Sequence, residues 1–214
     1  MSSADEVAAA ADIWKNWRTF TIKGKKSTRS SCPHYKGQPP HGAGGDDSDQ
    51  LMDKAAIDAL RVKKVKYLIS ANHNSISDVQ KAALTKAGIG YQWLPVPDFQ
   101  APSITQFKDC HREYRKNKEG VHFYCGWGDG RSGTYVTGVE ILEGVYTRKP
   151  TVAQYKKNHV ERDVQFKALD ALWEDWHKTR RLDSESGEVE GDEVVEEEEA
   201  VEEEGEEEEP VAAE

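Results

Sequence analysis

The sequence predicts an α/β fold of three layers, in which helices cover both faces of a mostly parallel sheet. Two observations lead to this prediction. Short apolar segments rich in β-branched and aromatic residues alternate with longer segments whose apolar residues recur at helical spacing, and glycines and prolines separate them. Strands joined through helices run parallel, because the helix returns the chain to the same end of the sheet.

The elements follow in order along the chain. We expect strands at residues 65–69, 90–96 and 121–124, helices over residues 79–87, 104–114, 135–146 and 166–176, and an edge strand within residues 20–31. Residues 36–49 are rich in glycine, proline and aspartate and are predicted to form a flexible surface loop.

Charge divides the chain into a basic body and an acidic end. From Leu182 onward there are 18 acidic residues and no Lys or Arg, whereas residues 1–181 hold 29 basic and 21 acidic residues, a net charge of +8. Like-charge repulsion and the lack of aromatic residues predict that residues 182–214 form a disordered tail. We therefore divide the chain into an N-terminal segment (1–16), one domain (17–181) and the tail.

The same charges suggest partners. The basic body is expected to attract anionic substrates. The tail is expected either to bind a basic partner or to screen the substrate pocket electrostatically, and a role in solubility alone is an equal alternative.

Composition also bears on location. No stretch approaches the roughly 18 apolar residues of a membrane span, and the N-terminus lacks the basic start and apolar run of a secretory signal. Cys32, Cys110 and Cys125 form no disulfide or zinc pattern. We expect a protein of the cytoplasm or nucleus with no metal or other cofactor, no membrane partner and no preference for nucleic acid.

The most informative segment lies between the last predicted strand and the following helix, and it reads CGWGDGRSG from Cys125. Glycines at a strand–loop–helix junction let backbone N–H groups surround an anion, and the helix N-terminus adds partial positive charge. A thiol placed there is pushed toward the thiolate, the form that attacks phosphorus. Arg131 can fold back as a bidentate fork on phosphate oxygens.

The spacing therefore assigns a role to each residue of the loop. Cys125 is predicted as the nucleophile, Arg131 as the phosphate clamp, and Ser132 as a hydrogen-bond donor to the leaving sulfur. The residues predicted to bind the substrate phosphate are Gly126, Trp127, Gly128, Asp129, Gly130 and Arg131.

A second segment, PVPDFQAPS over residues 95–103, supplies an acid. An alkoxide or phenoxide leaves badly, so a proton must arrive as the P–O bond breaks. Asp98 is predicted as this general acid, and it can later take a proton from the water that hydrolyses a cysteinyl-phosphate.

Both segments resemble the protein tyrosine and dual-specificity phosphatases, whose phosphate-binding loop has the form C-x-x-G-x-G-R-S-G. The loop is most similar to those of bacterial and fungal phosphatases grouped as Swiss-army-knife enzymes. The resemblance covers about residues 17–180 and implies the dual-specificity fold, a cysteinyl-phosphate intermediate and a general-acid loop around Asp98.

Two positions depart from the family pattern. Tyr124 precedes the nucleophile where most members have His. Asp129 stands where basic or neutral residues are common, and its side chain is expected at the pocket mouth, where it would oppose highly anionic substrates. Trp127 is expected either to wall the pocket and stack on a phosphotyrosine ring or to pack beneath the loop.

The predicted function is a phosphomonoesterase acting on a phosphorylated protein side chain, with phosphotyrosine as the first candidate. Nucleotides, RNA 5′ ends and inositol phosphates are alternative substrates. Two further alternatives are a pseudophosphatase that binds phosphorylated partners without turnover and a domain whose acidic tail binds a basic protein.

Overall fold

The computed structural model describes residues 12–40, 42–117 and 119–186. Most of the predicted acidic tail lies outside the described residues, so its disorder stays a prediction.

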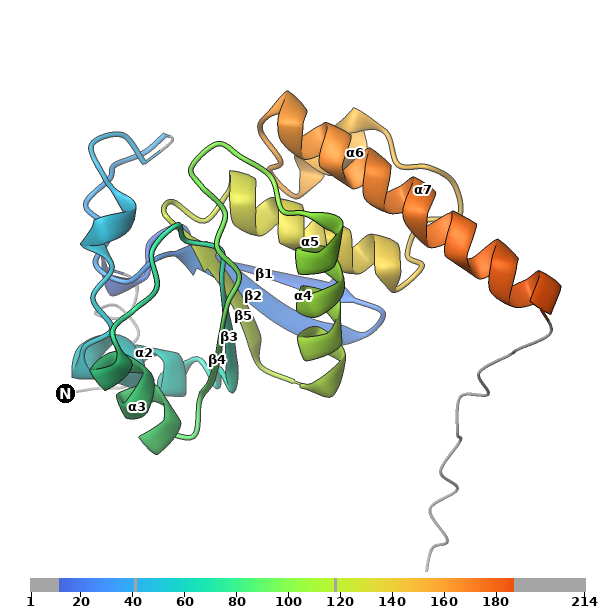
Figure 1. The fold of residues 1–214 in the computed structure, drawn as a ribbon. Helices are drawn as coiled ribbons and strands as arrows, with labels where there is room; N and C mark the ends of the chain where they lie inside the picture. The colour runs from blue at the N-terminus through green and yellow to red at the C-terminus, as the bar shows by residue number, and fades with distance from the viewer. Residues whose placement is uncertain (1–11, 41, 118, 187–214) are drawn as a thin grey trace, which may run out of the picture.

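A five-stranded sheet forms the centre of the molecule, with the strand order β1-β2-β5-β3-β4 (Figure 1). Its strands are β1 (Arg18–Ile22), β2 (Lys25–Ser31), β3 (Tyr67–Ser70), β4 (Gly90–Trp93) and β5 (Val121–Cys125). The β1–β2 pair is antiparallel and the other neighbours are parallel. The predicted α/β class with a mostly parallel sheet is confirmed, and residues 20–31 contribute a hairpin at one edge.

The helices are η1 (Asp47–Asp49, a 3-10 turn), α2 (Lys54–Val62), α3 (Asp78–Lys86), α4 (Ile104–Lys116), α5 (Gly130–Leu142), α6 (Val152–Lys157) and α7 (Asp163–Ser186). Local sequence fixes where several of them start. Three helices start with a capping box, at Ser77, Ser103 and Thr151. In each, the side chain of the capping residue accepts a hydrogen bond from the backbone N–H of a Gln three residues later, and the Gln side chain accepts one from the backbone N–H of the capping residue. Helix α6 was not predicted from the sequence, because six residues are too few to show helical periodicity.

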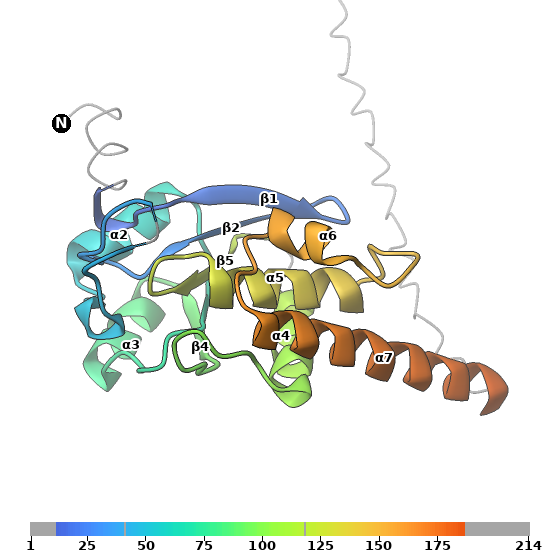
Figure 2. The ribbon, with the colours of Figure 1, turned by 90° about the horizontal axis from the view of Figure 1, so that it is seen from above.

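Helices cover both faces of the sheet, as Figures 1 and 2 show, with α2 and α3 on one face and α4, α5 and α7 on the other. Alternate side chains of one strand enter different cores: Phe123 packs among residues of α4, α5 and α7, whereas Tyr124 packs among residues of α2 and α3.

The described structure continues past both predicted boundaries of the domain. Trp14 is buried and donates its Nε1 hydrogen to the Ala56 carbonyl at 3.1 Å, so packing begins before residue 17. Helix α7 runs to Ser186, beyond residue 181. Among the described residues, no helix combines the length and apolar character needed to cross a membrane.

The parallel strands bring distant segments together at the end of the sheet where the strands terminate. Strands β3, β4 and β5 all end there, so the residues after Ser70, Trp93 and Cys125 meet although they are far apart in the sequence. In open α/β sheets, ligands bind at the carboxyl ends of the strands.

Candidate active site

Cys125 is the last residue of β5 and is almost fully buried at the base of the loop that leads into α5. The Gly128 backbone N–H points at its Sγ with an N···S distance of 3.3 Å. The Ser132 hydroxyl oxygen lies 3.5 Å from the same sulfur. The sulfur therefore accepts a backbone N–H, and its own thiol hydrogen points at the hydroxyl oxygen, whose hydrogen goes to the Asp129 carbonyl.

Two glycines let the loop close this tightly. Gly128 has a φ of +98°, and a Cβ on it would lie 2.3 Å from the carbonyl carbon of Ser30. A Cβ on Gly133 would lie 2.0 Å from the Asn158 carbonyl oxygen. The loop is thus packed against β2 beneath it and against the segment after α6, and no larger residue fits at either position.

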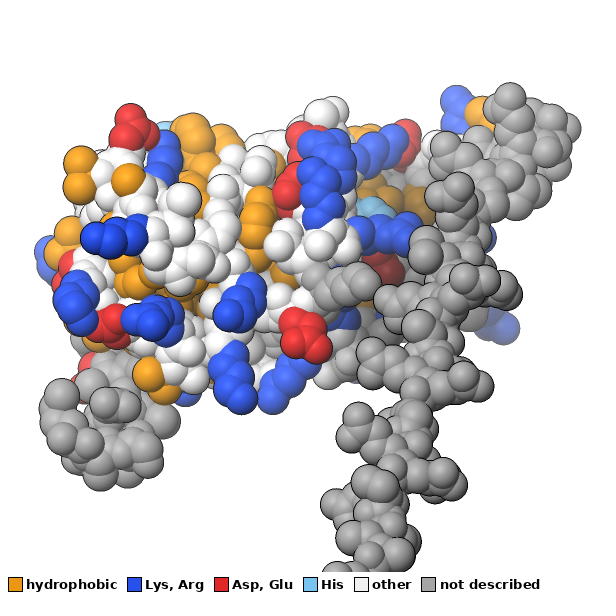
Figure 3. Space-filling model, turned by 90° about the horizontal axis from the view of Figure 1, so that it is seen from below, with side chains coloured by type: hydrophobic (Ala, Val, Ile, Leu, Met, Phe, Trp, Pro, Cys, Tyr) orange, Lys and Arg blue, Asp and Glu red, His pale blue; other side chains and the backbone are white. Residues whose placement is uncertain are grey.

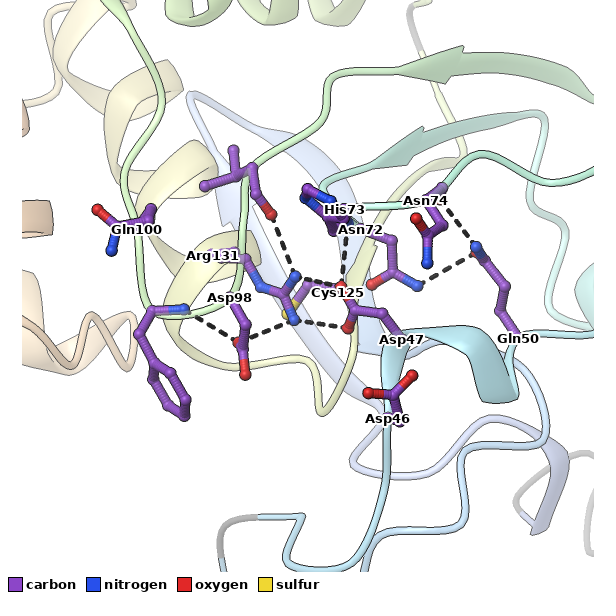
Figure 4. Close-up of polar contacts among 12 residues, drawn as sticks. Asp46, Asp47, Gln50, Asn72, His73, Asn74, Asp98, Gln100, Cys125 and Arg131 are labelled. Carbon is purple, nitrogen blue, oxygen red and sulfur yellow. Dashed lines mark hydrogen bonds and ion pairs between the residues drawn. The ribbon is translucent and has the colours of Figure 1, made fainter.

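The Arg131 guanidinium lies at the mouth of the loop, and four oxygens surround it (Figure 4). It donates to both carboxylate oxygens of Asp47, at 2.5 and 2.8 Å, and to the Val96 carbonyl at 3.2 Å. Its Nη2 also lies 3.1 Å from Oδ1 of Asp98. Burial lowers the pKa of Arg131, but the hydrogen bonds to Asp47 and the charges of Cys125, Asp47 and Asp98 more than offset this and raise the pKa above its usual value.

Asp98 lies in the segment after β4, and its carboxylate reaches Arg131 from the solvent side. The carboxylate also accepts a hydrogen bond from the Phe99 N–H at 3.0 Å. The helices behind anchor this segment: Gln106 donates to the Pro95 carbonyl at 2.7 Å, and Gln165 donates to the Gln100 carbonyl at 3.1 Å. The carboxylate is therefore exposed, yet it lies on a segment held at both ends.

The carboxylate of Asp129 lies behind the loop. The prediction that it lies at the pocket mouth is wrong. The side chain is 9% exposed. It lies 3.5 Å from Nη2 of Arg18 and 3.7 Å from Nδ1 of His159. Burial lowers the pKa of the neighbouring Arg29 to about 10, while the charge of Asp129 acts in the opposite direction. Asp129 thus balances the half-buried Arg18 of β1 and the buried Arg29 of β2.

Trp127 packs sideways against the loop that precedes η1. Its ring centroid lies 6.1 Å from that of Tyr35, and its carbonyl accepts a hydrogen bond from the Asn16 side chain at 3.1 Å. This arrangement favours the packing interpretation of Trp127.

A hollow of about 290 Å³ adjoins the loop, and it is acidic. The carboxylates of Asp46, Asp47 and Asp98 line it together with His73. A hydrogen bond from the Ser48 side chain lowers the pKa of Asp46, and a hydrogen bond from the Ser48 backbone N–H lowers it further. The Asp46 carboxylate therefore stays ionised at neutral pH. Among the described residues, no group of His, Cys, Asp and Glu could hold a metal ion.

Comparison with known proteins now adds to this geometry. A family model described as "Polymorphic toxin system, DSP-PTPase phosphatase" matches residues 47–145, a range that includes Asp98 and the whole loop from Cys125 to Arg131. Over this range the chain is similar to the dual-specificity type of protein tyrosine phosphatase that the model describes. No curated protein sequence matches the chain.

Solved phosphatase structures share the fold at low sequence identity. A mutant form of Tk-PTP is 19% identical with a TM-score of 0.53, covering 75% of this chain and 97% of its own. PTPMT1 in complex with PI(5)P is 15% identical with a TM-score of 0.52, covering 76% and 98%. The core catalytic domain of the PP-IP phosphatase SIW14 from S. cerevisiae is 13% identical with a TM-score of 0.51, covering 79% and 92%.

The structure brings together Cys125, Arg131, Ser132 and Asp98, which the sequence singled out. It also adds Asp47, which the sequence did not single out. Asp47 belongs to the segment predicted as a flexible loop, and it is held in place by the His73 N–H, which donates to its Oδ2 at 3.0 Å. The local sequence holds only a weak signal of this order, the capping box of Asp46 and Asp49 that builds η1.

Proposed function

We propose that this phosphatase hydrolyses phosphate monoesters through a cysteinyl-phosphate intermediate, and that phosphorylated protein side chains, phosphotyrosine first, are its substrates. One observation carries the mechanism. The sulfur of Cys125 receives the Gly128 N–H at 3.3 Å at the base of a loop whose mouth holds the Arg131 guanidinium. A nucleophile and an anion clamp at this spacing suit an attack on a bound phosphate.

The first step transfers the phosphoryl group to the enzyme. The loop N–H groups and Arg131 bind the phosphate oxygens, the thiolate of Cys125 forms the S–P bond, and the P–O bond to the leaving group breaks. Asp98 gives its proton to the departing oxygen. Because the carboxylate of Asp98 already lies at the mouth of the loop, a side-chain rotation away from Arg131 suffices for this role.

The second step releases phosphate. Water attacks phosphorus, Asp98 takes the proton of this water, and the S–P bond breaks to return the thiolate. The Ser132 hydroxyl, which now donates to the Asp129 carbonyl at 3.1 Å, can rotate to donate to the departing sulfur 3.5 Å away.

The acidic hollow supports a protein substrate. Asp46, Asp47 and Asp98 would repel a ligand that carries several phosphates, whereas one phosphate on a peptide meets Arg131 and the loop. The similarity to PTPMT1, solved in complex with PI(5)P, and to the PP-IP phosphatase SIW14 supports the alternative of a lipid or inositol phosphate equally. A phosphate-binding pseudophosphatase is the third possibility.

A substrate panel separates these functions. The purified chain is assayed on phosphotyrosyl and phosphoseryl peptides, a phosphoinositide, an inositol polyphosphate and a small aryl phosphate, with Cys125→Ser as the blank. We expect fastest turnover of the phosphotyrosyl peptide and none by the blank, whose loop still binds phosphate. Faster turnover of the inositol compounds would identify them, and not phosphorylated proteins, as the substrates. Phosphopeptide binding without any turnover would indicate a pseudophosphatase.

A further inference from the structure

A basic cleft lies at the end of the sheet opposite Cys125, where the parallel strands begin. Its volume is about 1340 Å³, and its walls come from the β1–β2 hairpin, the end of α2 and the turns that lead into β3 and β5. Six basic and two acidic side chains line it: Lys25, Lys26, Arg61, Lys63, Lys64 and Lys66, with Asp58 and Glu119. Figure 3 views this end of the molecule and shows Lys and Arg side chains spread around exposed hydrophobic ones.

Most of these cations lack a compensating carboxylate. Arg61 pairs with Asp58 at 3.7 Å, and Lys25 donates to the Tyr114 carbonyl at 3.0 Å. Within the described part of the chain, no carboxylate pairs with Lys26, Lys63, Lys64 or Lys66. Uncompensated charges of one sign in a cleft with apolar walls focus the electrostatic potential there. The cleft therefore favours a polyanion with some apolar surface.

The chain carries such a polyanion itself. Residues 187–214 hold 16 acidic residues and no Lys or Arg, with valines and alanines between them. We propose that this segment docks in the basic cleft.

Length and position allow the contact. Helix α7 starts near the catalytic end and slopes toward the opposite end, and its last residue is Ser186 (Figure 1). The remaining 28 residues can span at most about 90–100 Å, and a domain of this size is roughly 40 Å across. Covalent attachment also gives the segment a high effective concentration, in the millimolar range for a short tether.

The other end of the molecule is a poor site for the same segment. The hollow beside the loop is lined by Asp46, Asp47 and Asp98, which repel carboxylates. The expectation that the tail screens the substrate pocket stays a prediction, and the uncompensated cations favour docking at the far end.

Zero-length carbodiimide cross-linking of the full chain tests the docking at low salt. The variant Lys63→Glu/Lys64→Glu/Lys66→Glu is compared with a control of equal charge change, Lys156→Glu/Lys157→Glu/Lys167→Glu, at exposed lysines far from the cleft. We expect cross-links from residues 187–214 to Lys26 in the native chain and in the control. In the cleft variant their yield should fall roughly tenfold, since juxtaposed like charges are strongly unfavourable. Links spread evenly over all exposed lysines, or unchanged in the cleft variant, would overturn the proposal.

Binding of a labelled oligonucleotide to the full chain tests the competing occupant. If the segment fills the cleft, the native chain binds the oligonucleotide weakly. Replacing Glu196–Glu199 and Glu206–Glu209 by Gln should then raise the affinity, and adding the cleft substitutions should abolish the gain. Tight binding by the native chain that depends on Lys63, Lys64 and Lys66 would instead assign the cleft to nucleic acid from solution and overturn the docking. Circular dichroism verifies that every variant is folded.

Discussion

Arg131 shares its guanidinium between two carboxylates that have different tasks. Asp47 is mostly buried and binds both terminal nitrogens of Arg131, whereas Asp98 is largely exposed and binds one of them. The bidentate partner fixes the orientation of the fork, and the exposed partner can leave it. At the scale of single residues, these two carboxylates therefore yield different kinetic predictions.

Asp98→Asn removes a proton donor without changing the shape of the side chain. We expect kcat to fall by roughly 10²–10³-fold on phenyl phosphate, the range of a positioned general acid. The fall should be far smaller for an aryl phosphate whose leaving group is already acidic, because that group needs no proton. Rates on the two substrates check this, and an equal loss on both would assign Asp98 a structural role.

Asp47→Asn leaves Arg131 without its bidentate anion. A hydrogen bond to a charged group contributes about 1.5–3 kcal/mol, so we expect kcat/KM to fall by roughly 10–100-fold. Asp46→Asn, at an exposed carboxylate that does not contact Arg131, is the matched control on a small aryl phosphate. If the inhibition constant of vanadate instead falls in Asp47→Asn, Asp47 competes with phosphate for the fork.

At the scale of elements, His122 joins the two strands under the site. It is fully buried in β5, its Nδ1 lies 2.8 Å from the Thr28 hydroxyl and its Nε2 lies 3.0 Å from the Ser30 hydroxyl. Burial lowers the pKa of His122 to about 3. The unfolded chain binds the proton near pH 6.5, so the stability from the neutral ring is complete above that pH and is lost as the pH falls toward 3.

This linkage predicts that lowering the pH from 7 to 5 reduces the free energy of unfolding by about 2 kcal/mol through His122 alone. Urea unfolding at both pH values measures it in the native chain and in His122→Gln, which lacks the titrating ring. We expect a smaller pH dependence in His122→Gln and an unchanged one in His73→Gln, whose side chain is exposed. Equal pH dependence in all three proteins would show that His122 takes up a proton in the folded state.

Elements were predictable from sequence where the pattern is local. The apolar run that ends at Cys125 and the glycines after it indicate a strand, a loop and a helix within one short segment. Asp47 was not predictable, because it lies 84 residues from Arg131 in the chain and meets it only through the fold of the segment before α2. The orientation of Asp129 likewise depends on Arg18, which a hairpin on the sheet edge brings behind the loop.

At the scale of the whole molecule, the two ends of the sheet differ in charge. The net charge of +8 over residues 1–181 suggests a body that attracts anions everywhere. In the structure, however, uncompensated lysines surround the amino ends of the strands, whereas three carboxylates line the hollow at the carboxyl ends. Strand β5 spans about 17 Å between these ends, which exceeds the Debye length of about 8 Å at physiological ionic strength.

The catalytic end should therefore select its substrates by their own local charge. We expect a phosphotyrosyl peptide with flanking lysines to have a several-fold higher kcat/KM than one with flanking glutamates, because Asp46 and Asp47 attract the former. The preference should shrink as salt rises and should weaken in Asp46→Asn. Replacing Glu206–Glu209 by Gln should leave it intact, since that segment docks at the far end. A preference for flanking glutamates, or one that disappears with those four substitutions, would mean that the acidic segment and not the hollow governs the field at the mouth.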